Sequence, residues 1–311
     1  MKMKRMKSLC TGLVFVLFGL MAAGSGSSDS SNETKAITTE NAAAQQQSEN
    51  TATADRETEK SDDTKVTIEE QVLLEQNDIK VTAVSMESDS IWGDGIKLLI
   101  ENNSTTNIGV GCNALIVNDY MISDLFSSPV AAGKKANETL YISSSELKAA
   151  GITNIGQIEI YFHIYDSDSY ETLFDAEPVI IKTSLYDKMD TTADVNGEEL
   201  YNQDGVRIIG QYVDENSFWG TAVLLYIENT SGRNVGVSCD NMSINGFMVT
   251  PLFSSTVYND KKAYDDITIL SSDLEENNIT SVEDIELNFH IFDADSYSTI
   301  CDTGAISFQA N

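Results

Sequence analysis

Apolar and polar residues alternate along several short stretches of this chain, and the clearest stretch covers residues 158–165. Its apolar positions fall on one face of an extended strand, and they are Ile158, Ile160, Phe162 and Ile164. Burial of such side chains contributes about 1.5–3 kcal/mol each. We therefore predict that this strand forms the centre of a core. Similar stretches recur with turn residues between them, which is typical of a β-sandwich.

One short helix is predicted within this β pattern, over residues 144–150. Serine stands at its start and Glu146 places an acid in its first turn, where both stabilise a helix N-terminus. Gly151 follows the helix, and Asn278 stands at the matching place of a second such segment. Glycine and asparagine are the residues that best tolerate the left-handed conformation at the end of a helix. We expect one helix of this kind in each domain.

The alternating pattern occurs twice, with a constant offset of 127 residues. Trp92 matches Trp219, and residues 162–166 (Phe-His-Ile-Tyr-Asp) match residues 289–293 (Phe-His-Ile-Phe-Asp). A repeat of this length is a whole domain, so the chain is a tandem duplication. We predict an all-β fold with one sandwich over residues 65–184, a linker over 185–198 and a second sandwich over 199–311. Any functional site of such a chain is expected in both copies.

The N-terminus predicts export. A basic head, a short apolar stretch and small residues together make a secretory signal over residues 1–24. The segment around Ser25 is similar to a lipoprotein signal in which serine replaces the lipid-bearing cysteine. Residues 25–64 hold almost no large apolar side chain, so we expect a disordered stalk. The predicted location is secreted or on the extracellular face of the cell envelope, without a transmembrane span in the mature chain.

The chain is strongly acidic. It holds 49 acidic and 19 basic residues, for a formal charge of −30. Such a surface repels nucleic acid and anionic lipid, which argues against both as partners. It favours solubility or, alternatively, a cationic partner such as a divalent metal or a basic polymer.

A family resemblance follows from several motifs. They are Glu101-Asn102-Asn103-Ser104, the turn at Asn118, Ala132-Gly133-Lys134-Lys135, the helix up to Ile152, and the Asp166-x-Asp168 ending. Over both repeats the chain resembles the immunoglobulin-like domain of uncharacterised exported lipoproteins of Gram-positive bacteria. The resemblance implies two tandem immunoglobulin-like β-sandwiches on the cell envelope, and it implies no catalytic residues.

Paired aspartates follow the central strand of each copy. They are Asp166 and Asp168 in the first copy, and Asp293 and Asp295 in the second. Their carboxylates are suitable calcium ligands, but Asp and Ser side chains also shape tight turns by bonding to nearby backbone amides. These loops therefore either bind calcium or form turns that need no cofactor.

Histidines and tryptophans are the other duplicated candidates. His163 and His290 are expected on the outer face of the sheet beside aromatic neighbours, with zinc binding or pH sensing as the alternative. Trp92 and Trp219 precede strands, and either pack against the fold or offer a platform on which sugar rings stack.

Three cysteines follow the signal segment, and two lysine pairs are duplicated. Cys112, Cys239 and Cys301 are predicted to be buried free thiols, with a Cys239–Cys301 disulfide as the alternative. The pairs Lys134-Lys135 and Lys261-Lys262 are expected at solvated turn tips.

Common catalytic motifs are missing from the sequence. It contains no Gly-x-Ser-x-Gly, no His-Glu-x-x-His and no phosphate loop ending in Gly-Lys-Ser/Thr. We predict a non-catalytic extracellular or cell-envelope binding or spacer protein whose partner is a surface protein or a glycan. The alternatives are a structural envelope module without a ligand and, more distantly, a carboxylate-dependent hydrolase acting on wall polymer.

Overall fold

The computed structural model describes residues 66–89, 93–123, 125–193 and 195–309. All of them lie in one compact unit, Ser61–Asn311. The predicted signal and stalk, Ser25 and Trp92 lie outside the described residues. No helix in the described ranges is both long and apolar enough to cross a membrane.

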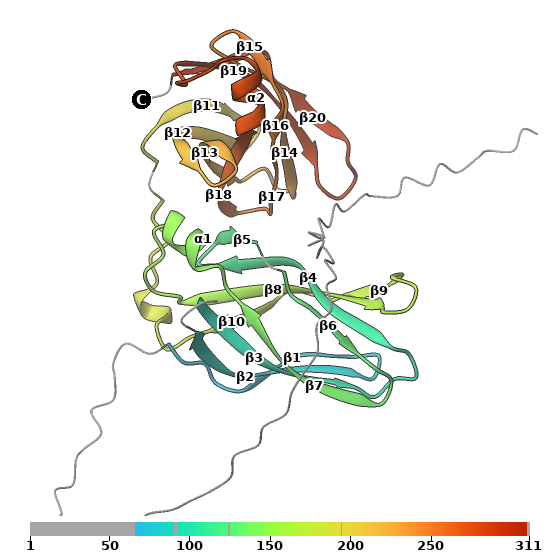
Figure 1. Ribbon diagram of the computed structural model, residues 1–311. Coiled ribbons are helices and arrows are strands. Elements are labelled where there is room, and N and C mark those ends of the chain that lie inside the picture. The colour runs from blue at the N-terminus through green and yellow to red at the C-terminus, as the bar shows by residue number, and fades with distance from the viewer. Residues whose placement is uncertain (1–65, 90–92, 124, 194, 310–311) are drawn as a thin grey trace, which may run out of the picture. The chain divides into compact units, whose positions relative to one another are not determined.

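The fold is all-β, with two tandem immunoglobulin-like sandwiches and one short α-helix in each, as the sequence predicts (Figure 1). One sheet of the first sandwich has the order β1-β2-β3-β7, formed by Gln71–Gln76, Ile79–Asp89, Gly93–Asn102 and Lys134–Tyr141. The facing strands have the order β10-β8-β4-β5, formed by Val179–Lys182, Gln157–Asp166, Ile108–Val117 and Tyr120–Ile122. Two short strands extend these, β6 (Ser127–Val130) beside β4 and β9 (Thr172–Asp175) beside β8.

The second sandwich repeats this arrangement after a 3-10 turn at Tyr186–Lys188. One layer has the order β11-β12-β13-β18, formed by Glu198–Gln203, Val206–Ser217, Gly220–Asn229 and Lys261–Leu270, with β16 (Pro251–Leu252) beside β18. The other has the order β15-β14-β19-β20, formed by Phe247–Val249, Val235–Ile244, Asp284–Asp293 and Thr299–Asp302. There, β17 (Ser254–Val257) pairs with β14 and β21 (Ile306–Gln309) with β19.

The predicted central strand is confirmed as β8 in the first sandwich and β19 in the second. Ile158, Ile160, Phe162 and Ile164 are fully buried, and so are their counterparts, Ile285, Leu287, Phe289 and Ile291, at 1% exposure or less. The period of two places these side chains on one face of each sheet. Each sandwich thereby has its own apolar core.

A buried asparagine fastens each sandwich at the same place. The Nδ2 of Asn102 donates to the carbonyls of Thr106 and Val130, and its Oδ1 accepts from Ser104. Asn229 makes the matching bonds in the second copy. Each side chain is fully buried with its donors and acceptor paired, so this motif stabilises the end of β3 or β13.

The predicted helices are confirmed, and both end at a left-handed residue. Helix α1 spans Ser144–Ala149 and α2 spans Ser271–Glu276. Gly151 (φ 67°) and Asn278 (φ 56°) both adopt the left-handed conformation. The next residue in each copy then donates its N–H back to the helix, from Ile152 to Leu147 in α1, as a helix-ending motif requires.

Candidate functional site

The β4–β5 hairpin of the first sandwich contacts strand β18 of the second. The carbonyl of Asp119 accepts the N–H of Lys262 at 2.9 Å, and Lys262 pairs in parallel with Tyr120. The ring of Tyr120 stacks on that of Tyr264 at 5.7 Å, and Tyr264 lies 5.4 Å from Tyr226. Tyr120 and Tyr226 are each 1% exposed, so the contact has an aromatic, dry centre.

An ion pair crosses the same contact. Lys261 Nζ lies 2.7 Å from Glu159 Oε2 and 3.1 Å from Asp119 Oδ1. Although burial opposes the charge, hydrogen bonds to these two carboxylates raise the pKa of Lys261. The prediction of a solvated Lys261-Lys262 turn tip is wrong, because both amines are bound: Lys262 Nζ donates to the carbonyl of Thr191. Lys261 also covers Glu159, which alternation alone places on an outer face, and leaves it only 7% exposed.

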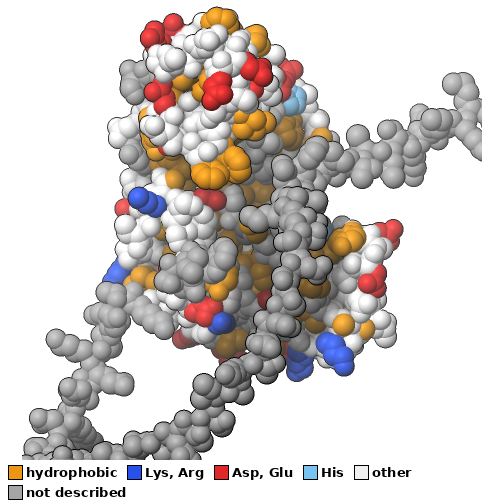
Figure 2. Space-filling model, in the orientation of Figure 1, with side chains coloured by type: hydrophobic (Ala, Val, Ile, Leu, Met, Phe, Trp, Pro, Cys, Tyr) orange, Lys and Arg blue, Asp and Glu red, His pale blue; other side chains and the backbone are white. Residues whose placement is uncertain are grey.

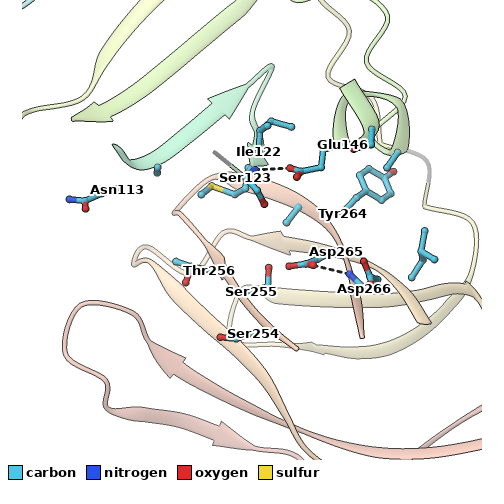
Figure 3. A pocket seen from close by; sticks show the side chains of 16 residues that line it. Asn113, Ile122, Ser123, Glu146, Ser254, Ser255, Thr256, Tyr264, Asp265 and Asp266 are labelled. Carbon is cyan, nitrogen blue, oxygen red and sulfur yellow. Dashed lines mark hydrogen bonds between the residues drawn. The ribbon is translucent and has the colours of Figure 1, made fainter. Parts of the chain in front are cut away.

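A pocket of about 580 Å³ lies beside this contact and is lined from both sandwiches (Figure 3). The β5 hairpin contributes Met121, Ile122 and Ser123, and α1 contributes Glu146 and Ala149. The other wall comes from β13, β17 and β18, with Leu224, Ser254, Ser255, Tyr264, Asp265 and Asp266.

Two carboxylates of this pocket are held in place by backbone amides. Glu146 Oε2 accepts the N–H of Ser123 at 2.6 Å, which ties α1 to the β5 hairpin. Asp265 Oδ1 accepts the N–H of Asp266 at 2.8 Å (Figure 3). Both side chains therefore have one fixed oxygen, and the pocket is built around defined carboxylate positions.

The electrostatics of these carboxylates are perturbed. Burial, together with the charges of Asp266 and Glu146, raises the pKa of Asp265 to about 6, against the hydrogen bonds from Asp266 and Ser255 that lower it. Burial likewise raises the pKa of Glu146. Among the described residues that line the pocket there is no Lys, Arg or His. The acids consequently carry a cost of desolvation and mutual repulsion that no basic side chain of the lining offsets.

This arrangement can bind a cation or exchange a proton. A bound cation stabilises the ionised carboxylates and relieves their repulsion. Proton transfer is the alternative chemistry, because the pKa of Asp265 lies close to the range that general acids and bases use. The apolar neighbours Met121, Ile122 and Leu224 add a surface suited to an alkyl group.

Glu146 and Asp265 are not among the residues that the sequence predicts for a site. The expectation that every site occurs twice does not apply to them, because the pocket lies between the two copies and is formed once. The sequence does, however, mark the contact between the two copies through positions at which they differ. Tyr226 replaces Leu99 and Tyr264 replaces Asn137 of the first copy, so aromatic residues mark the strand that receives the hairpin.

The paired aspartates shape turns. Asp166 Oδ1 accepts the N–H groups of Asp168 and Ser169, and these bonds lower the pKa of Asp166. Asp293 accepts from Ser296 in the same way, and its pKa is lowered too. Asp168 is engaged by the side-chain amide of Asn107. These contacts match the turn interpretation, while calcium binding stays a prediction.

Each histidine pairs with an aspartate on the adjacent strand. His163 Nδ1 lies 2.7 Å from Asp175 Oδ1, and His290 Nδ1 lies 2.5 Å from Asp302 Oδ1. The side chains stack on Tyr165 and Phe292, the aromatic neighbours that were expected. In the second sandwich Asp240 joins the pair, and ligand atoms of Asp240, His290 and Asp302 lie within 4.8 Å of one another.

The first sandwich lacks that third carboxylate. Asn113 stands at the position of Asp240 and donates to Asp175 at 2.8 Å. The three side chains of the second copy have the spacing to hold a metal ion. The sequence did not predict this cluster, because its three residues lie on separate strands that become neighbours only in the folded sheet.

Trp219 is exposed rather than packed in the core. Its side chain is 66% exposed, and that of Phe218 beside it is 88% exposed, with the two rings edge to face at 4.8 Å. Packing of Trp219 in the core is therefore wrong, and packing at an edge or a platform for a ligand ring remain as the alternatives. Trp92, its counterpart, lies outside the described residues.

Among the described residues Cys112, Cys239 and Cys301 form no disulfide, so the Cys239–Cys301 alternative is wrong. Cys239 is buried, and burial raises the pKa of its thiol to about 11. Cys112 and Cys301 are only partly buried.

Comparison with known proteins gives structural matches that share little sequence with this chain. No protein-family model and no curated protein matches the chain. One similar solved structure is the Salmonella enterica SafA pilin in complex with the SafB chaperone, at 12% identity and a TM-score of 0.21, covering 69% of this chain and 88% of that one. Another is a protein of unknown function from Porphyromonas gingivalis W83, at 8% identity and a TM-score of 0.20, covering 79% and 97%.

Proposed function

We propose that this chain is a non-catalytic binding protein of the cell exterior or envelope, and that its ligand is a basic side chain presented by a partner protein. The observation that carries the proposal is the pocket beside Tyr264, where Glu146 and Asp265 have raised pKa values without a basic residue in the lining. A cation that enters such a pocket stabilises the ionised carboxylates, so its binding is favourable.

The lining favours an organic cation over a metal ion. Calcium takes six to eight oxygen ligands, whereas much of this pocket is made of aliphatic side chains such as Met121, Ile122 and Leu224. Lys and Arg combine an alkyl stem with a charged head. The stem of such a residue packs on the aliphatic wall while its head reaches Asp265 and Glu146.

The surface of the protein supports a basic partner. The formal charge of −30 attracts cationic segments over long range and repels anionic polymers. Figure 2 shows the acidic side chains dispersed over the face in view and not gathered into one patch. The long-range attraction is therefore general, and the pocket supplies the specific contact.

The test is fluorescence anisotropy with a labelled Gly-Ser peptide that carries one Lys and one Arg. The matched control peptide carries norleucine and citrulline, which keep the stems and remove the charges. We expect the basic peptide alone to bind, with one site per chain because the pocket is formed once. Asp265→Asn and Glu146→Gln should each weaken binding by about tenfold.

Asp273→Asn is the matched control variant. Asp273 holds the N–H of Thr250 in the second copy as Glu146 holds that of Ser123 in the first, but it does not line the pocket. Equal binding of the two peptides, or binding that Asp265→Asn and Glu146→Gln leave unchanged, would contradict the proposal. Two equivalent sites per chain would instead favour one binding site on each sandwich and a bivalent chain.

Glycan binding at Trp219 is the second candidate, favoured by the exposed pair of Phe218 and Trp219. Aromatic faces of this kind stack on sugar rings. A glycan array with the purified chain tests it: signals that disappear in Trp219→Ala, with an unchanged melting temperature, support this site. An array without signals, or signals that the variant retains, rejects it.

A further inference from the structure

The two copies differ in what covers their short hairpin. In the first sandwich the β5 strand contacts β18 of the second, and Tyr120 and Asp119 are engaged there. In the second sandwich the matching strand, β15, pairs only with β14 within the described residues. Its side chains Phe247 and Met248 are 49% and 65% exposed. Figure 2 shows hydrophobic side chains exposed at the end of the second sandwich where Figure 1 places β15.

The strand that would receive this hairpin is β7 of the first sandwich, the counterpart of β18. Within the described residues β7 pairs only with β3, so it ends the sheet β1-β2-β3-β7. Its register is the same: Glu101 faces Lys135 in β3–β7 as Glu228 faces Lys262 in β13–β18. Because the N–H of Lys262 points out of its sheet toward Asp119, that of Lys135 points out at the free edge of β7.

Charge complementarity accompanies these two free surfaces. Lys134 and Glu286 are the counterparts of Lys261 and Glu159, which form the buried ion pair of the observed contact. Lys134 and Glu286 are both exposed. The sequence thus retains a second lysine and glutamate of this kind, Lys134 in the first sandwich and Glu286 in the second.

We propose that the β15 hairpin of one chain docks on the β7 edge of a second copy of the same chain, repeating the contact that joins the two sandwiches. Phe247 and Met248 then cover the second copy's β7, and Glu286 pairs with Lys134 across the interface. The contact joins two different surfaces, so it is a head-to-tail interface that adds copies in a row or closes a ring.

Two substitutions make this interface weaker than the observed one. Gly246 replaces Asp119, which removes one partner of the lysine, and Asn137 replaces Tyr264, which removes the ring that stacks on Tyr120. The association is therefore reversible and depends on concentration.

Sedimentation velocity and light scattering on the purified exported chain, over a wide concentration range, test the proposal. We expect the mean mass to rise with concentration beyond that of a dimer. Phe247→Asp should weaken association by about tenfold or more. Glu286→Lys should weaken it as well, and adding Lys134→Glu in the same chain should restore it. Glu177→Lys, a change of equal charge at another exposed position, should have little effect.

A gain-of-function variant keeps the test independent of these losses. Gly246→Asp with Asn137→Tyr reinstates the two missing contacts and should tighten association. Space is open at Gly246, and its φ of 81° is close to the 69° that Asp119 adopts, so the fold accommodates the aspartate. A monomer at every concentration, or self-association that Phe247→Asp and the charge exchange leave unchanged, would overturn the proposal.

Discussion

Lys261 of the second sandwich lies 2.7 Å from Glu159 of the first, and both side chains are largely buried. Their repeat counterparts, Lys134 and Glu286, are both exposed. Equivalent residues therefore have opposite environments, and the contact between the sandwiches is the cause. This contact also forms one side of the acidic pocket. The packing of the two sandwiches and the proposed function therefore depend on the same surface.

Removing one partner of that pair should be costly. Lys261→Met leaves Glu159 with an unpaired, buried charge, and such changes lower the free energy of unfolding by about 3 kcal/mol or more. Urea denaturation followed by circular dichroism measures it. Lys134→Met, in dilute solution, is the matched control and should change stability by less than about 0.5 kcal/mol. Equal effects of the two variants would show that the buried ion pair adds no more to the free energy of unfolding than an exposed lysine does.

The hydroxyl of Tyr120 should be dispensable. It is buried at the contact and has no hydrogen-bond partner among the described residues, and burial raises the pKa of Tyr120 well above its usual value. Removing an unpaired buried hydroxyl relieves its desolvation penalty. Tyr120→Phe, which installs the residue found naturally at 247, should therefore leave thermal stability unchanged or raise it. A clear loss of stability would reveal a partner for the hydroxyl, and Tyr120→Ala provides the contrast, with an expected loss of about 3 kcal/mol.

Asp265 should make the protein less stable as the pH rises. Its pKa is about 6 in the folded protein against a usual 3.8, so the folded state binds the proton more tightly than the unfolded state. Stability from this group is complete below about pH 4 and is lost as the pH rises through about 6. Asp265→Asn should remove this slope and stabilise the protein at pH 7 by up to about 3 kcal/mol.

Urea midpoints between pH 4 and pH 7 measure the slope, with Glu138→Gln at the matching position of the first sandwich as the control. The basic peptide proposed as a ligand should bind more tightly at pH 7 than at pH 5, because it prefers ionised Asp265. A wild-type slope retained in Asp265→Asn would assign the titration to another group.

The aspartate turns should be indifferent to calcium. Asp166 uses its carboxylate to accept two backbone N–H groups, and Asp293 does the same in the second copy. Asp166→Ala and Asp293→Ala should each lower the melting temperature by about 2–5 °C, with or without calcium. A rise in the wild-type melting temperature on adding millimolar calcium, lost in these variants, would support the calcium site instead.

The central strand of each sandwich and the position of each helix could be predicted from the sequence because their signals are local. Alternation at Ile158, Ile160 and Phe162 needs only a period of two, and Gly151 terminates α1 through its own backbone conformation. The duplication strengthened both predictions, since Asn278 repeats the role of Gly151. The turns at Asp166 and Asp293 belong to the same class, because their partners lie two or three residues away.

The burial of Glu159 and Lys261, the pairing of His290 with Asp302 and the acidic pocket were decided by the tertiary structure alone. Each of these features joins residues from separate strands or from both copies. The two copies have nearly the same pattern of apolar and polar residues, and this pattern is the same whether a position is exposed or covered. The sequence by itself determined two sandwiches with their cores, helices and turns, because short-range periodicity and backbone preferences encode them. Which of two equivalent surfaces is buried depends on what packs against it, and only the folded chain specifies that.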